Sequence, residues 1–153
     1  MKNELSIESI KKELIDKLIS SMDILKYLEV DKNEYIKLSQ VHNTFIYDYD
    51  NSDVTGNYIT VDVAEYESTD VKVRDSKKYI VSVKMGLEHA YNLDKLSATV
   101  KELILELYPN IKTYINVPIY VRKYEYLCLN GYREHNRLNR MIKFEIEENI
   151  SVE

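Results

Sequence analysis

Near the start of the chain, from Ile7 to Leu28, apolar residues recur at spacings of three and four, at Ile7, Ile10, Leu14, Leu18, Met22 and Leu25. This periodicity predicts an amphipathic helix, and Ile15 and Ile19 widen its apolar stripe. Ser6 is the predicted N-cap, because a serine hydroxyl can accept a hydrogen bond from a free N–H of the first turn. We therefore expect a helix over 6–28 that packs on a sheet or on a partner.

Alternating apolar and polar residues predict strands within 41–87. The clearest alternation covers 58–66 and 78–87, and a weaker run covers 41–49. The segment 71–74 fits either a short edge strand or a loop. Because the two clearest runs are close together in the sequence, they favour an antiparallel pair.

A second apolar stripe at helical spacing predicts a helix over 93–108. Pro109 should end it, since proline has no N–H and cannot continue the hydrogen-bond ladder. Within 111–147, residues 111–129 read as extended with an interruption at Pro118, and 138–147 reads as the last strand. Asn130-Gly131 is typical of the turn in a hairpin.

The order helix, strands, helix, strands predicts an α+β fold with a single domain over 1–153 and a frayed tail at 148–153. A mainly antiparallel sheet with two amphipathic helices packed on one face is the simplest way to bury both helical stripes. The single cysteine, Cys128, allows no internal disulfide. The apolar runs are far shorter than the roughly 20 residues that span a bilayer, and no secretory signal is recognisable. These features predict a cytoplasmic protein with no membrane partner.

The formal net charge of −5 argues against a general nucleic-acid binder, which usually has a basic surface. The charge is distributed unevenly, because no lysine or arginine occurs from Leu38 to Val71. The acidic set comprises Asp48, Asp50, Asp53, Asp62, Glu65, Glu67 and Asp70. The basic set comprises Arg122, Lys123, Arg133, Arg137, Arg140 and Lys143. One part of the fold is thus expected to be acidic and another basic.

Phosphate-binding loops are excluded by the three scattered glycines. The run from Asp48 to Asp53 looks like a calcium loop, but Asp53 stands where that loop requires glycine and Ile59 where it requires glutamate. A solvated acidic turn is the preferred interpretation. With one cysteine and three separated histidines there is no zinc set. We therefore predict neither a metal nor a cofactor.

Nucleophilic catalysis would need an activated side chain with a base beside it. Cys128 and His135 are the only pair close in sequence, and the apolar neighbours of Cys128 favour an inert strand cysteine. Glu88 and His89 are adjacent, so in a strand they would point to opposite faces. We predict no catalytic residue and no enzymatic activity.

The segment from Tyr120 to Lys143 interleaves basic and tyrosine residues. Aromatic faces stack on bases and arginine binds phosphate, so one interpretation is a nucleic-acid surface. Another is a solvated hairpin with charged outward positions. The third is a basic edge that meets an acidic edge of the next subunit, and a contact of that kind closes into a ring when the rotation allows.

The layout resembles that of small neck and tail-end proteins of tailed bacteriophages, above all the tail terminator, or tail completion, family. The similar elements are the amphipathic helix Ile7–Leu28, the strand Tyr58–Val63, a strand Tyr79–Val83 leading into the helix Leu93–Leu107, and the closing basic-to-apolar strand Arg137–Ile146.

The resemblance implies a virion protein, made in the host cytoplasm, that forms a ring, commonly a hexamer. Its partners would be copies of itself, the tail tube and the head connector, and DNA would pass through the ring without specific binding. An acidic lumen would keep DNA from adhering, because like charges repel. The acidic set is accordingly the candidate lumen or rim, and the basic set is the candidate subunit contact.

Two alternatives stay open at this point. The chain could be a head-completion or stopper protein of the neck, or a small cytoplasmic binding or regulatory protein unrelated to virions. The segment from Asp48 to Gly56 matches no motif of the family, so its role is also open.

Overall fold

The structure is a computed structural model, and the residues it describes are 5–30, 45–49, 56–67, 76–87, 92–109, 111, 114–128 and 131–149. Side chains are described in these ranges except at 66–67, 76–77, 114–128, 131–138 and 148–149, where only the backbone is described. The elements in chain order are α1 (Ile7–Ile19), α2 (Met22–Tyr27), β1 (Ile46–Tyr47), β2 (Tyr58–Glu67), β3 (Ser76–Gly86), α3 (Leu93–Leu107), β4 (Tyr114–Cys128) and β5 (Gly131–Asn149).

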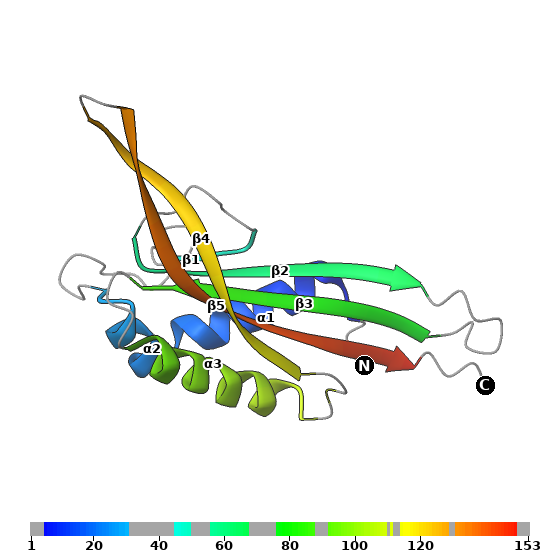
Figure 1. Cartoon of the computed structure of the whole chain (residues 1–153). Helices are drawn as coiled ribbons and strands as arrows, with labels where there is room; N and C mark the ends of the chain where they lie inside the picture. The colour runs from blue at the N-terminus through cyan, green and yellow to red at the C-terminus, as the bar shows by residue number, and fades with distance from the viewer. Residues whose placement is uncertain are drawn as a thin grey trace.

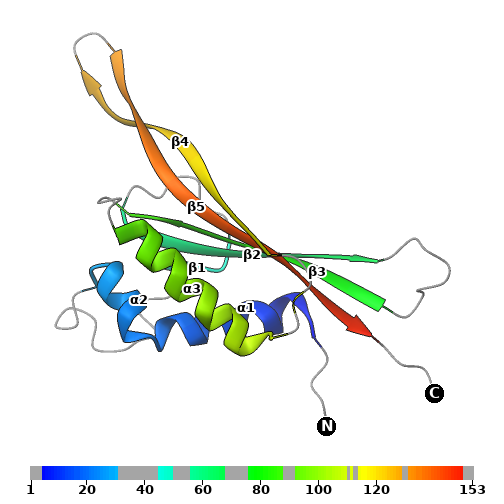
Figure 2. The same ribbon diagram turned by 60° about the horizontal axis from the view of Figure 1, so that its bottom comes forward.

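The five strands form one sheet in the order β1-β2-β3-β5-β4. β1 pairs with β2 in parallel, and every other neighbouring pair is antiparallel. The helices lie together on one face of this sheet (Figures 1 and 2), with α1 packed on β1 and β2 and α3 packed on β3 and β5. The predicted α+β fold, with a mainly antiparallel sheet and helices on one face, is confirmed.

The core lies between the helices and the sheet. Alternate residues of the central strands face the helices, so Val61 on β2, Val83 on β3 and Ile142 on β5 form one buried row. Opposite the sheet, Leu14 of α1 and Val100 of α3 are buried as well. Burying each such side chain contributes about 1.5–3 kcal/mol, which is why the apolar periodicity identifies these elements.

The predicted helix over 6–28 is in fact two helices that meet at Ser20 and Ser21. The Ser20 hydroxyl donates a hydrogen bond to the Asp16 carbonyl at 2.7 Å, and Ser21 caps α2 by accepting from the Ile24 N–H at 3.3 Å. Serine side chains compete in this way with the helical backbone. The break also changes which side of the chain is buried: Met22, predicted to be in the apolar stripe, is 57% exposed, whereas Ile24 is fully buried.

Other predicted features of the helices are confirmed. Ser6 caps α1, where its side chain and that of Ser9 each accept from the other's backbone N–H. α3 ends at Leu107, just before Pro109. One feature was not predicted: Glu29, two residues after the end of α2, has a left-handed backbone with φ 59°.

The last two strands differ from the prediction. Pro118 does not interrupt β4, because β4 is an edge strand and a proline there need not supply an N–H to a neighbour. β5 begins at Gly131 instead of Leu138 and continues to Asn149. Three other predicted features lie outside the described residues: the tail at 150–153, the turn residue Asn130 and the segment 71–74.

Candidate interaction surface

A two-stranded arm extends beyond the sheet. The last pair that β3 forms with β5 is Gly86 with Asn139, and past that point β5 pairs with β4 alone, from Tyr120↔Leu138 to Cys128↔Gly131. We call residues 120–128 and 131–138 the arm. Figures 1 and 2 show it projecting away from the helices and the rest of the sheet.

Both edges of the arm lack a strand partner among the described elements. An exposed strand edge can pair with any other chain, and natural proteins limit this with prolines, charges and bulges. Here Pro118 lies in β4 just before the arm begins, and within the arm the register shifts between Tyr124 and Tyr126, which is a bulge at Glu125. The arm therefore has the features of a protected edge, which favours recognition through side chains over open-ended strand pairing.

The base of the arm is fixed on the sheet face that points away from the helices, here called the outer face. Tyr58, Gly86 and Asn139 form one row across β2, β3 and β5. The Tyr58 hydroxyl donates a hydrogen bond to Asn139 Oδ1 at 2.5 Å, and both side chains are buried. Gly86 is required because a Cβ there would lie 2.2 Å from Asn139 Oδ1 and 2.6 Å from the Tyr58 ring.

The helix side of the sheet fixes the same point. Arg140, the next residue of β5, faces α3 and forms an ion pair with Asp94 in its first turn. The Arg140 side chain is 25% exposed and that of Asp94 is 80% exposed, so solvent weakens the ion pair. Consecutive residues of one strand thus anchor the arm base on both faces of the sheet, an arrangement we call the base clamp (Tyr58, Gly86, Asn139, Arg140 and Asp94).

The structure divides the basic set between the arm and the body. Arg122, Lys123, Arg133 and Arg137 belong to the arm, where the register places Val121 opposite Arg137 and Arg122 opposite Asn136. Arg140 belongs to the base clamp, and Lys143 is exposed on β5 beyond it. The sequence predicted a basic hairpin here, but it did not show that the hairpin projects from the body of the sheet. The predicted role of these residues in subunit contact stays a prediction.

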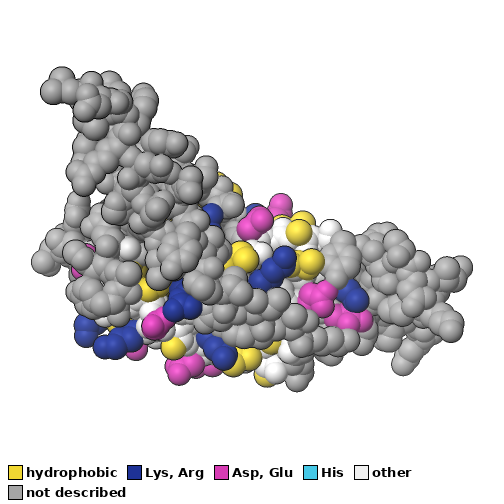
Figure 3. Space-filling view, viewed as in Figure 1, with side chains coloured by type: hydrophobic (Ala, Val, Ile, Leu, Met, Phe, Trp, Pro, Cys, Tyr) yellow, Lys and Arg dark blue, Asp and Glu magenta, His cyan; other side chains and the backbone are white. Residues whose placement is uncertain are grey.

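The acidic set is not brought together in the described part of the structure. Asp62 and Glu65 are exposed on β2, where alternation places them on opposite faces, and Glu67 ends that strand. Asp48 follows β1 and is half-buried. Asp50, Asp53 and Asp70 lie outside the described residues. Among the described residues on the face shown in Figure 3, acidic, basic and apolar side chains are interspersed.

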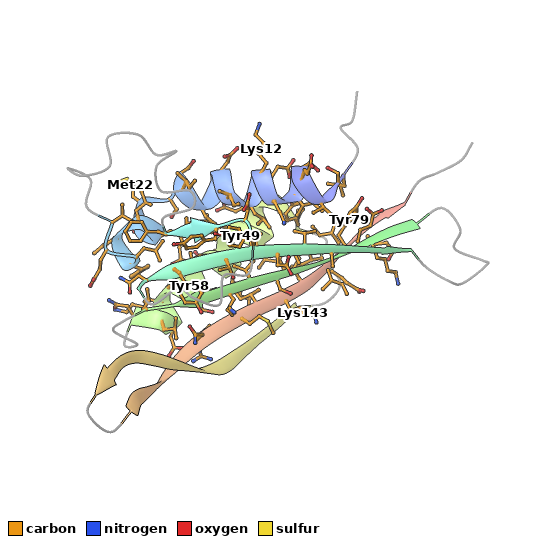
Figure 4. All side chains as sticks on the ribbon, turned by 90° about the horizontal axis from the view of Figure 1, so that it is seen from above. Lys12, Met22, Tyr49, Tyr58, Tyr79 and Lys143 are labelled. Carbon is orange, nitrogen blue, oxygen red and sulfur yellow. The ribbon has the colours of Figure 1, made fainter. Side chains whose placement is uncertain are left out.

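A groove that sequence reasoning missed runs along α1 beside the end of β1, with a volume of about 550 Å³. Its lining residues are Ile7, Glu8, Lys11, Lys12, Ile15, Asp16 and Asp48. Ile15 is buried and Ile7 half-buried, whereas Glu8, Lys12 and Asp16 are exposed, so an apolar floor has a charged rim. Figure 4 shows Lys12 on the side of α1 away from the sheet and Tyr49 near β1. No sequence signal joins Asp48 to α1, because their proximity is tertiary.

Cys128, the candidate nucleophile, is not close to His135 in the pairing of β4 with β5. Cys128 pairs with Gly131, and His135 lies four residues further along β5, opposite Lys123. Four residues of strand span roughly 13 Å, well beyond a nucleophile–base hydrogen bond. Glu88 and His89 lie outside the described residues.

Within the described ranges, no three His, Cys, Asp or Glu side chains gather in a way that could hold a metal ion. The helices in the described part of the chain are all too short or too polar to cross a membrane. No protein-family model matches the chain, and no curated protein sequence matches it significantly.

Proposed function

We propose that this chain is a structural subunit that assembles with copies of itself into a ring in the neck or tail of a bacteriophage. The ring acts as a tail terminator, which caps the tail tube and joins it to the head connector. The observation that carries the proposal is the arm, a two-stranded ribbon that leaves the sheet from a base held on both faces.

The arm favours a partner on energetic grounds. Two strands without a third strand or a packed helix are at best marginally stable in water. β4 makes its extensive contacts with β5 alone among the described elements. A contact with another subunit would supply the missing burial, which explains why so long a ribbon is kept.

The sheet edges favour a head-to-tail contact over a symmetric one. One edge is β4, which has fifteen residues, and the opposite edge is β1, which has two and lies against α1. Because the two edges differ, one edge of a subunit can meet the other edge of the next. Repeated contacts of this heterologous kind generate a ring when the rotation closes.

The phage assignment is supported by the order of elements, in which amphipathic helices precede strands and a third helix separates these from the closing hairpin. A formal net charge of −5 suits a ring through which DNA passes without sticking, since like charges repel. DNA accordingly passes through without specific contacts, and the ring binds the tail-tube and head-connector proteins.

The self-assembly part is tested by measuring the mass of the purified protein by light scattering and native mass spectrometry over a wide range of concentration at low salt. The proposal expects a closed oligomer. A variant in which Asn-Gly replaces residues 122–136, so that Val121 and Arg137 become the last pair, should be monomeric. Its circular dichroism should still show a folded body. A wild-type monomer at every concentration would count against the proposal, as would a ring that persists without the arm.

The phage part is tested by the genomic neighbourhood. Portal, capsid and tail-tube genes beside this gene are the expected result. A locus that contains no virion genes would overturn the assignment to a neck or tail while leaving self-assembly through the arm intact.

A further inference from the structure

We infer that the groove along α1 is the receptor for the arm of the next copy of this chain. This inference rests on the proposed function and adds the surface that the arm contacts. The receiving residues are those that line the groove, in particular Glu8, Ile15, Asp16 and Asp48.

The positions of the groove and the arm support this contact. The groove lies on α1 at the β1 edge of the sheet, and the arm leaves from the β4 edge. Seen from above in Figure 4, α1 and the arm are on opposite sides of the molecule. An arm cannot turn back into the groove of its own subunit, but it can enter that of a neighbour. Donor and receptor at opposite edges are the arrangement that a ring of identical subunits requires.

The charges of the arm and the groove also support the contact. The arm contains four basic residues and two acidic ones, Glu125 and Glu134, which gives a formal charge of +2 before His135 is counted. The groove lining contains three acidic and two basic residues, which gives −1. Opposite charges on the two surfaces steer the subunits into this contact and set its direction.

The residue types of the arm match those of the groove as well. The arm sequence is rich in tyrosine and arginine, the residue types enriched at protein interfaces, with tyrosines at 120, 124, 126 and 132. Such side chains combine an apolar body with a polar tip. The groove offers the matching surface, because Ile7 and Ile15 form its floor while Glu8 and Asp16 are exposed at its rim.

The test uses two charge-reversal variants of the full chain. The groove variant is Glu8→Lys with Asp16→Lys, and the control is Asp23→Lys with Glu102→Lys. All four side chains are exposed, and Glu8 and Asp23 both lie in the first turn of a helix. We expect subunit association at low salt to weaken at least tenfold in the groove variant and to change less than threefold in the control.

A mixing experiment makes the test specific. The groove variant retains its arm, and the arm-shortened protein retains its groove, so each has one half of the contact. Mixed together, they should form one-to-one pairs and no rings, as native mass spectrometry would show. If the wild type forms rings and the groove variant does too, the groove is not the receptor and only this inference fails. If the wild type never associates, the proposed function itself fails.

Discussion

Gly86→Ala is the substitution for which the structure gives the sharpest expectation. Gly86 lies beneath the hydrogen bond between Tyr58 and Asn139 at the base of the arm. The added methyl group would lie 2.2 Å from Asn139 Oδ1 and 2.6 Å from Tyr58 Cε1, whereas ordinary contact begins at 3.4 Å. Both neighbours are almost fully buried, so neither can swing into solvent without opening the outer face of the sheet.

Two effects add to the magnitude. Forcing a methyl group into a filled site costs about 1–3 kcal/mol. Separating the Tyr58 hydroxyl from Asn139 Oδ1 costs about 1–3 kcal/mol more, because both polar groups are buried. We therefore expect Gly86→Ala to lower the free energy of unfolding by about 2–6 kcal/mol.

Urea unfolding followed by circular dichroism measures this change, at a single low protein concentration so that association does not contribute. Gly56→Ala is the matched control, since a Cβ there meets nothing within 4 Å, and it should change stability by less than about 0.5 kcal/mol. In an Asn139→Ala background the cost of Gly86→Ala should shrink by about 1 kcal/mol or more. Equal stability of Gly86→Ala and Gly56→Ala would refute the reasoning.

Three further predictions concern the helices and their contact with β5. Glu29→Gly should stabilise the protein by about 0.5–1 kcal/mol in urea unfolding, because glycine adopts φ 59° without strain, whereas Glu29→Ala should be close to neutral. Burial, the hydrogen bond to Glu13 and the charge of Glu13 raise the pKa of Tyr108 above its ordinary value of 10.0. The stabilisation that Tyr108 contributes is therefore fully present below pH 10.0 and is lost as the pH rises above that value. In alkaline unfolding titrations the Tyr108→Phe variant should lose less stability than the wild type. Asp94→Asn should lower the free energy of unfolding by less than about 1 kcal/mol, since Asp94 is 80% exposed. Arg140→Ala should lower it by more, because packing of the long side chain is lost as well. Equal effects of the two substitutions would show that the ion pair dominates.

The sequence predicted the elements whose burial is periodic. The stripe on α3 and the alternation on β2 and β3 repeat with the helical and strand periods, so both their type and their buried face were recognisable. The helix break was missed because Leu18, Met22 and Leu25 keep a helical spacing across Ser20 and Ser21. The serine hydrogen bonds at the break leave no trace in the apolar pattern.

The arm and the groove depend on relations between distant segments. The residues of β5 on either side of Asn139 look alike as strand formers, and the difference between them is that β3 ends at Gly86. The groove needs Asp48 to lie beside α1, although more than thirty residues separate it from Asp16 in the sequence. Pattern reasoning therefore identified a basic hairpin but could not show that it projects from the body or what it faces.

The base clamp explains why polar groups are buried in the outer face at the point where the arm begins. The nine residues from Tyr120 to Cys128 extend roughly 30 Å at strand spacing, so a tilt of about 10° at the base would move the tip by about 5 Å. The contact that we infer between the arm and a neighbour's groove would not tolerate that error, since ordering a loose arm would oppose association. A directional hydrogen bond between Tyr58 and Asn139 fixes the angle better than an apolar contact would, because its energy depends on geometry. Gly86 follows from the same requirement, since only a residue without a side chain leaves room for that bond to cross β3.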